Sequence, residues 1–129
     1  MIAEFRIKNF LSIKTEQCLS FEATSDSLKE SEYCIEVKEG VRLLKTAIIY
    51  GANASGKTNI LLALSFFQDL MVNVPKDKNE EIKFECFWLD NTSRNEKTEM
   101  ALTFYLENEK YAVSDELTGL FNRRKFNSI

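Results

Sequence analysis

The chain has 129 residues, of which 44% are hydrophobic and 29% are charged, and its formal net charge is −3. This composition is typical of one globular domain with a modest core, and it excludes an intrinsically disordered chain. No apolar run approaches the length of a membrane span, and Glu4, Arg6 and Lys8 interrupt any signal-peptide core. The acidic balance gives no overall attraction to nucleic acid. We therefore expect a soluble cytoplasmic protein with no membrane partner.

The cysteines bear on the redox environment of the chain. Cys18, Cys34 and Cys86 are odd in number and widely spaced, and no C-x-x-C pair occurs. Such a pattern favours free, buried thiols in a reducing compartment over a disulfide or a metal site.

The first 44 residues carry many signals for strands and few for helices. Residues 1–13 alternate, with Ala3, Phe5 and Ile7 on one face and charged residues on the other, which predicts a half-buried strand. Residues 9–12 predict a turn after it. The further expected elements are a strand at 18–23, a polar loop at 24–32, a strand at 33–37, a turn at 39–40 and an extended segment at 41–44.

The middle of the chain predicts a strand, a glycine-containing loop and a helix in succession. Residues 46–50 form a short apolar, partly β-branched run, which is typical of a buried parallel strand. Residues 59–71 carry apolar side chains almost all round the helical circle, so we expect a helix that is buried on most of its sides. Asn73 and Pro75 should end that helix.

The loop at residues 51–58 reads G-A-N-A-S-G-K-T and fits the phosphate-binding (Walker A) pattern G-x-x-x-x-G-K-[ST]. At average residue usage such a match arises by chance in well under roughly 1% of chains this long. The pattern predicts backbone N–H groups that converge on ATP phosphates, with Lys57 as candidate catalytic residue on the β- and γ-phosphates and Thr58 as candidate Mg²⁺ ligand. The candidate nucleotide-binding residues are Gly51, Ala52, Asn53, Ala54, Ser55, Gly56, Lys57, Thr58 and Asn59.

A charged, solvated stretch is expected at residues 76–81, followed by an alternating strand at 82–89. Residues 86–90 imitate a Walker B strand, because four apolar residues precede an acid. A Walker B strand in a P-loop ATPase needs a second acid at the next position, and here Asn91 stands at that position. We therefore interpret residues 90–93 as an ordinary turn.

The last clear pattern before the tail is a β-hairpin. Residues 99–107 alternate and predict a strand, residues 108–109 a turn, and residues 111–113 the start of a return strand. The expected inward side chains of the first strand are Met100, Leu102, Phe104 and Leu106, and the expected outward ones are Thr103, Tyr105 and Glu107.

Two stretches together resemble the start of a known kind of ATPase head. Residues 5–12 read F-R-I-K-N-F-L-S, and residues 50–59 read Y-G-A-N-A-S-G-K-T-N. At this separation they resemble RecF, the structural-maintenance-of-chromosomes (SMC) proteins and the overcoming-lysogenization-defect (OLD) nucleases. The resemblance is strongest to bacterial AAA-family ATP-binding proteins of that group, and it covers residues 1–113.

The resemblance implies an α/β fold, namely a partial P-loop NTPase head like that of ATP-binding-cassette (ABC) ATPases. Such a head has an N-terminal antiparallel β-layer, one buried helix after the loop and a C-terminal β-hairpin. The resemblance also implies ATP and Mg²⁺ as cofactors, and a homodimer of heads that sandwiches two ATP molecules in the full-length parent. It implies a role of the parent in DNA repair or phage defence, and it leaves DNA binding open.

The tail at residues 114–129 resembles something else. Residues 115–126 read D-E-L-T-G-L-F-N-R-R-K-F, which is similar to the opening of diguanylate cyclase (GGDEF) domains. The segments that bind metal and guanine in that family do not occur here, so the tail alone cannot make cyclic di-GMP. The alternative interpretation is a polar turn and a basic strand that continue the ATPase head.

Several groups that such ATPases use for hydrolysis have no counterpart in this sequence. No signature motif and no Walker B acid pair occur, and the chain contains no histidine to serve as a switch residue. We therefore expect the N-terminal lobe of an ATPase, truncated or fused, that binds ATP but does not hydrolyse it alone. The alternatives are a nucleotide-responsive interaction module and a fragment of a GGDEF-type signalling fusion.

Overall fold

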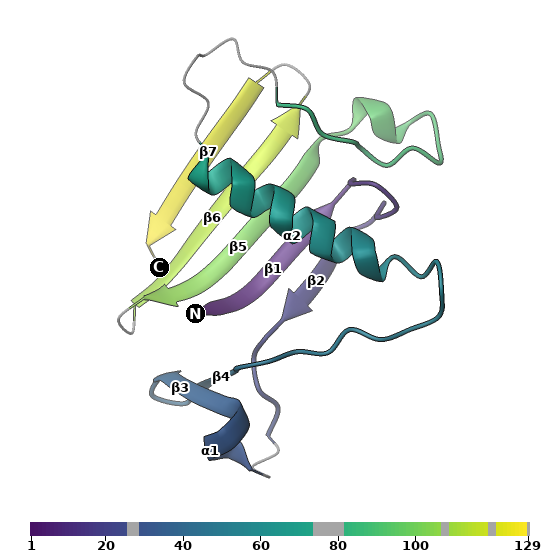
Figure 1. The fold of residues 1–129 in the computed structure, drawn as a ribbon. Coiled ribbons are helices and arrows are strands. Elements are labelled where there is room, and N and C mark those ends of the chain that lie inside the picture. Colours follow the sequence, from purple (N-terminus) through teal and green to yellow (C-terminus); the bar gives the residue numbers. More distant parts are fainter. Residues whose placement is uncertain (26–28, 74–81, 107–108, 119–120, 129) are drawn as a thin grey trace.

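The computed structural model describes residues 1–25, 29–73, 82–106, 109–118 and 121–128. An antiparallel sheet forms one layer, and the long helix α2 (Lys57–Val72) lies across one of its faces (Figure 1). The sheet has five strands in the order β2-β1-β5-β6-β7, and every neighbouring pair is antiparallel. Its strands are β1 (Ile2–Lys8), β2 (Gln17–Ser20), β5 (Thr98–Leu106), β6 (Glu109–Thr118) and β7 (Phe121–Ser128).

The predicted N-terminal strand is confirmed as β1, which lies between β2 and β5. Ala3, Phe5 and Ile7 are buried, as the alternation predicts, because one face of the strand packs into the core. The predicted turn follows it, closed by mutual backbone hydrogen bonds between Phe10 and Ile13. The strand predicted at 18–23 is shorter than expected and ends at Ser20.

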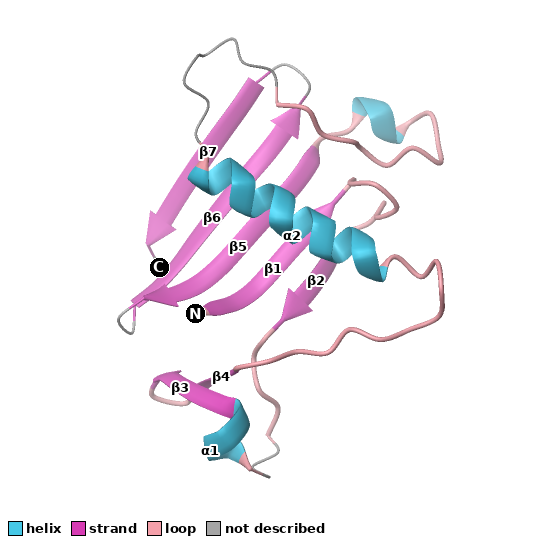
Figure 2. Cartoon of the chain, in the orientation of Figure 1, coloured by secondary structure: helices cyan, strands magenta, loops and turns pink. Residues whose placement is uncertain are grey.

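Helix α2 begins at Lys57, and Asn73 is its C-terminal cap, so the predicted helix is confirmed. Its core-facing side holds Ala63 and Phe67, and the Phe67 ring lies 5.8 Å from that of Phe5 on β1, between ring centroids. The prediction of burial on most sides is wrong. Leu61 and Leu62 are exposed, because the sheet covers one side of the helix and no other described element covers the opposite one (Figure 2).

A small hairpin covers a second, separate core. It consists of β3 (Cys34–Lys38) and β4 (Val41–Leu44), joined by a turn in which Gly40 has a φ of 77°. Its Val37 and Leu43 pack with Ala3 and with Tyr105 of β5. Tyr105 was predicted to face outward. It is buried because this hairpin covers the end of β5, whereas Leu106, predicted inward, is exposed.

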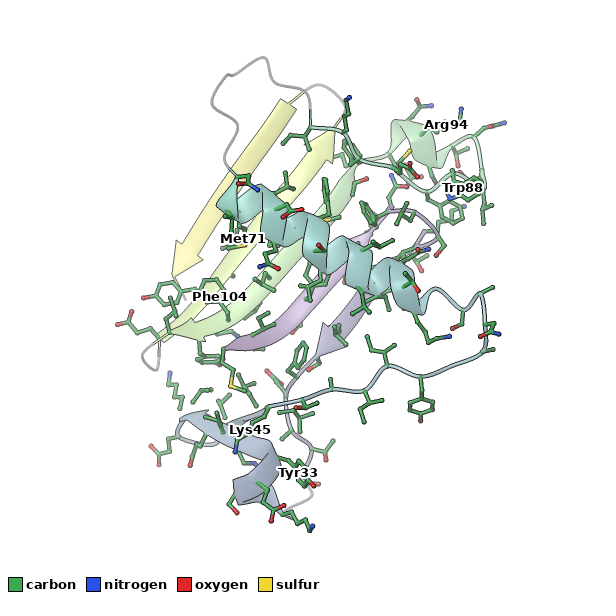
Figure 3. The ribbon with its side chains drawn as sticks, viewed as in Figure 1. Tyr33, Lys45, Met71, Trp88, Arg94 and Phe104 are labelled. Carbon is green, nitrogen blue, oxygen red and sulfur yellow. The ribbon has the colours of Figure 1, made fainter. Side chains whose placement is uncertain are left out.

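The sequence predicts a polar loop at residues 24–32, before this hairpin, and that prediction is only partly right. The last residues of this stretch form the short helix α1 (Glu30–Tyr33). The Lys45 ammonium donates hydrogen bonds to the carbonyls of Ser31 and Glu32, and the Lys45 N–H donates to the Tyr33 carbonyl. Figure 3 shows Lys45 and Tyr33 side by side at this end of the molecule. These carbonyls belong to the last turn of a helix, where a cation is favourable.

The strand predicted at residues 46–50 does not form. The segment is extended but pairs with none of the strands in the described ranges. Ile48 is 84% exposed and Tyr50 is 89% exposed. A parallel strand needs a neighbour on its edge to satisfy its backbone groups and to cover its side chains, and here that neighbour is missing. The predicted buried parallel strand is therefore wrong for this structure.

The strand predicted at residues 82–89 is also wrong, although the turn after it is confirmed. The segment is extended without ladder pairing, Phe87 is buried, and Trp88 points away from the core (Figure 3). A short 3₁₀ helix, η1 (Ser93–Asn95), follows the turn at Asp90. The charged stretch predicted at 76–81 and the turn residue at 108 lie outside the described residues.

The predicted C-terminal hairpin is confirmed and extends further than expected. Strands β6 and β7 pair from Tyr111 with Ser128 to Thr118 with Phe121, so the tail continues the same sheet. All three cysteines are free, as predicted, but Cys18 is exposed and the other two are only half-buried. No helix among the described residues is long and apolar enough to cross a membrane.

Candidate nucleotide-binding loop

The loop at residues 51–56 leads directly into α2. Gly56 immediately precedes the helix and has a φ of 89°, and Ala54 has a φ of 63°. These left-handed conformations curl the chain tightly, and glycine adopts them without strain. A Cβ on Gly51 would lie 3.1 Å from the Ser55 hydroxyl, so the loop closes against its own first glycine. Ala52, Asn53 and Ala54 are exposed at the crest.

The Lys57 side chain folds back over this loop. Its ammonium donates hydrogen bonds to the carbonyl oxygens of Gly51 at 2.9 Å and of Ala52 at 2.6 Å, and it lies 3.5 Å from the Ser55 hydroxyl. Carbonyl oxygens are partly negative, so they satisfy the cation in the way that phosphate oxygens would. The contacts place the Lys57 ammonium against the first residues of its own loop.

The start of α2 presents backbone donors beside this charge. The Gly56 carbonyl accepts hydrogen bonds from the N–H groups of Asn59 and Ile60. The preceding N–H groups, those of Gly56, Lys57 and Thr58, have no acceptor within the helix, as at any helix N-terminus. The helix has 16 residues, and its dipole adds partial positive charge at this end. The Ser55 N–H is instead used within the loop, where it donates to Ala52.

The structure adds a residue that the sequence interpretation did not place at this loop. Ser12 lies in the turn after β1, and its hydroxyl oxygen accepts a hydrogen bond of 2.6 Å from the side-chain amide of Asn59. The same hydroxyl lies 3.4 Å from the position that a Cβ on Gly56 would occupy. The I-K-N-F-x-S opening contains Ser12, but a sequence pattern carries no information about which distant loop a turn faces.

The turn that carries Ser12 is anchored by a buried asparagine. Asn9 is fully buried, and its side-chain amide donates to the carbonyls of Ser93 and Glu96 at 2.8 and 3.0 Å. Its side-chain oxygen accepts from the Phe87 N–H, and its backbone carbonyl accepts from the Thr98 hydroxyl. Because each polar group of a buried side chain must find a partner, this network fixes the turn to the segment before β5.

Asp90, the acid that imitates a Walker B residue, has a structural role. Its carboxylate forms an ion pair with Lys14 and accepts hydrogen bonds from the N–H groups of Thr92 and Ser93. The Lys14 ammonium and, next, the Ser93 N–H hold the pKa of this carboxyl well below its usual range. Across the described residues, no group of three or more His, Cys, Asp or Glu side chains is placed to hold a metal ion.

Comparison with known proteins assigns the family. Residues 47–114, more than half of the chain, match the family described as "AAA domain, putative AbiEii toxin, Type IV TA system". No curated protein and no solved structure matches the chain. The match contains the whole loop and α2, and the diguanylate cyclase resemblance of the tail finds no support in it. AAA domains are nucleotide-binding domains of the ATPase type, and this chain belongs to the AAA domain family that it matches.

Proposed function

We propose that residues 51–59 bind the phosphates of ATP together with Mg²⁺. The observation that carries this proposal is the Lys57 ammonium, held by the Gly51 and Ala52 carbonyls over a curled loop at the N-terminus of a 16-residue helix. A lysine charge, free helix N–H groups and a curl of glycines are the donor set that triphosphates take in P-loop proteins.

The residues present fit such a ligand. Phosphate oxygens would take the place of the Gly51 and Ala52 carbonyls as acceptors for Lys57, and they would also receive the N–H groups of Gly56 and Lys57. The Thr58 hydroxyl stands in the first turn of the helix, where it would hold Mg²⁺. When bound, Mg²⁺ neutralises part of the phosphate charge, and the protein's own groups orient the triphosphate.

The proposal assigns binding and not turnover to this chain. Asp90, which could be mistaken for a water-activating acid, is committed to Lys14 and to the turn that it begins. The chain has no histidine. Hydrolysis needs a positioned base or water-orienting group as well as phosphate-binding groups. We therefore propose that groups beyond those described here complete catalysis in a larger ATPase.

The parent's type and process rest on the resemblance of residues 5–12 and 50–59. We propose an ATPase head of the RecF, SMC and OLD kind, which pairs as a homodimer of heads and acts in DNA repair or phage defence. We also propose that the tail continues the head rather than beginning a cyclase domain. The pairing of β7 with β6 in the same sheet supports that choice.

The test of binding is Lys57→Ala, measured by calorimetry with Mg²⁺ and ATP. A charge-assisted contact to phosphate contributes about 1.5–3 kcal/mol, so affinity should fall by about 10- to 150-fold. Lys45→Ala is the matched control, because Lys45 also donates to backbone carbonyls but at the end of α1. It should leave ATP affinity unchanged. Equal affinities of the wild type and the Lys57→Ala variant would exclude Lys57 as a phosphate ligand.

A further inference from the structure

The turn between β1 and β2 is built against the normal preference of its residues. Asn9 and Leu11 have φ angles of 54° and 49°. Asparagine tolerates this left-handed region, but leucine adopts it rarely and at a cost. Such conformations persist where the surroundings enforce them, and they are concentrated where the position of a side chain matters. The residue that follows this conformation is Ser12.

The turn is held from three directions, so Ser12 is presented rigidly although it is exposed. The Leu11 N–H donates to the Glu85 carbonyl at 3.0 Å. The Phe10 ring lies 5.5 Å from that of Phe66 on α2, between centroids. The buried Asn9 side chain adds its hydrogen bonds to the segment before β5.

Besides the Phe10 ring, this turn presents the Ser12 hydroxyl group to α2. It accepts the Asn59 side-chain amide, and it lies against the last glycine of the loop. Asn59 is thereby committed on both sides, because its backbone N–H donates to the Gly56 carbonyl. The two bonds together hold the first turn of α2 to the loop through Gly56 and to the turn after β1 through Ser12.

We propose that Ser12 is a positioning residue of the nucleotide-binding loop and that it acts through Asn59. In this role Ser12 sets the direction of the N–H groups of Gly56, Lys57 and Thr58 before a ligand arrives. Asn59, the last residue of the proposed binding segment, then contributes by positioning the first turn of α2 through its bond to Ser12. The inference rests on the proposed function, since it assigns a role within the same site.

The experiment is a double-mutant cycle on ATP affinity with Ser12→Ala, Asn59→Ala and the double variant. Each single variant should lower the affinity for ATP by about two- to tenfold, the usual range for one lost hydrogen bond. The double variant should lose no more than the weaker-binding single variant, because both changes remove the same bond. Thr15→Ala is the control, since Thr15 is exposed nearby and its hydroxyl accepts a hydrogen bond from Gln17.

The melting temperatures of Ser12→Ala and Thr15→Ala should stay close to that of the wild type, because both residues are exposed. An effect on affinity without an effect on stability separates positioning from a general structural role. Additive losses in the double variant, or wild-type affinity in Ser12→Ala, would overturn the inference. A loss of ATP affinity in Ser12→Ala that is accompanied by a clear fall in its melting temperature would overturn the inference too.

A second measurement tests the inference without nucleotide, so that it does not fail merely because ATP binding fails. The backbone amide resonances of Gly56, Lys57 and Thr58 should shift in Ser12→Ala but not in Thr15→Ala. Unchanged resonances would refute the positioning role. If Ser12→Ala causes these shifts but the wild-type chain does not bind ATP, the proposed function alone is refuted.

Discussion

Asp90 follows four apolar residues, as a Walker B acid would. Its carboxylate instead accepts hydrogen bonds from the turn that Asp90 begins. Lys14 neutralises it, and two backbone N–H groups bind it. The sequence carried a signal for this outcome, since Asn91 stands where the second acid of an ATPase is needed. The position of Lys57 at the start of α2 was likewise predictable, because the loop pattern fixes where it falls, and its role in ATP binding stays a prediction. What no pattern predicted was Lys14, which lies in a distant turn.

The Asp90 ion pair makes a pH-dependent contribution to stability. The folded pKa of Asp90 is depressed, so its stabilisation is fully present above the unfolded value of about 3.9 and is lost as the pH falls below it. Asp90→Asn should lower the melting temperature at neutral pH. The difference from the wild type should narrow progressively below about pH 4.

Thermal melts across this pH range test the prediction, with Asp69→Asn as the control. Asp69 is an exposed carboxylate on α2, and its loss should change the melting temperature little. A gap between wild type and Asp90→Asn that stays constant, or widens, as the pH falls would contradict the assignment.

Among the elements, β1 and α2 were predictable and residues 46–50 and 82–89 were not. Alternation and helical periodicity predict which face of an element is buried. In β1 and on the core side of α2 the predicted side chains are buried. An apolar run such as residues 46–50 indicates side chains that would be more stable when buried. It does not indicate whether a neighbouring strand is present to bury them. For residues 82–89 the competing partner is a side chain, since the Phe87 N–H donates to Asn9 instead of to a strand.

The core side of α2 should carry most of that helix's contribution to stability. Phe67 is 1% exposed and packs against Phe5, so Phe67→Ala should cost about 3–5 kcal/mol through lost burial and a cavity. Leu62→Ala on the same helix is the control. Leu62 is 49% exposed, so its loss should change stability by about 0.5 kcal/mol or less. Urea denaturation measures both, and equal losses would mean that the helix packs through a different face.

At the scale of the whole molecule, helix, sheet and hairpin form two cores of unequal size. The larger lies between α2 and the sheet, and the smaller lies under the β3–β4 hairpin. The chain passes from the second to the first through residues 46–50, which neither core covers (Figure 1). The loop at residues 51–58, which follows this segment, was predictable from the spacing of its glycines and its lysine. The sequence could not predict Ser12 beside the loop, because their proximity depends on the packing of Phe10 against Phe66.

Hydrogen exchange should reveal this arrangement directly. Backbone amides of β1 and β5 are paired within the sheet and should exchange slowly, whereas those of residues 46–50 should exchange as fast as in an unfolded chain. Mass spectrometry of peptides from each region measures the two rates. Protection of residues 46–50 comparable to that of β5 would mean that they pair as a strand in solution. The amides of the β3–β4 hairpin should fall between these extremes.

The position of β1 has a consequence for any shortened version of this chain. The similarity to the AAA family begins at residue 47, but β1 lies between β2 and β5 and supplies Phe5 to the face that α2 covers. A cut at the boundary of similarity would turn β5 into a bare edge, open to pairing with other chains, and would remove the Phe5 ring that packs against Phe67. The family match and the folded sheet therefore have different boundaries in this chain. The matched segment pairs, through β5, with a strand that lies outside it.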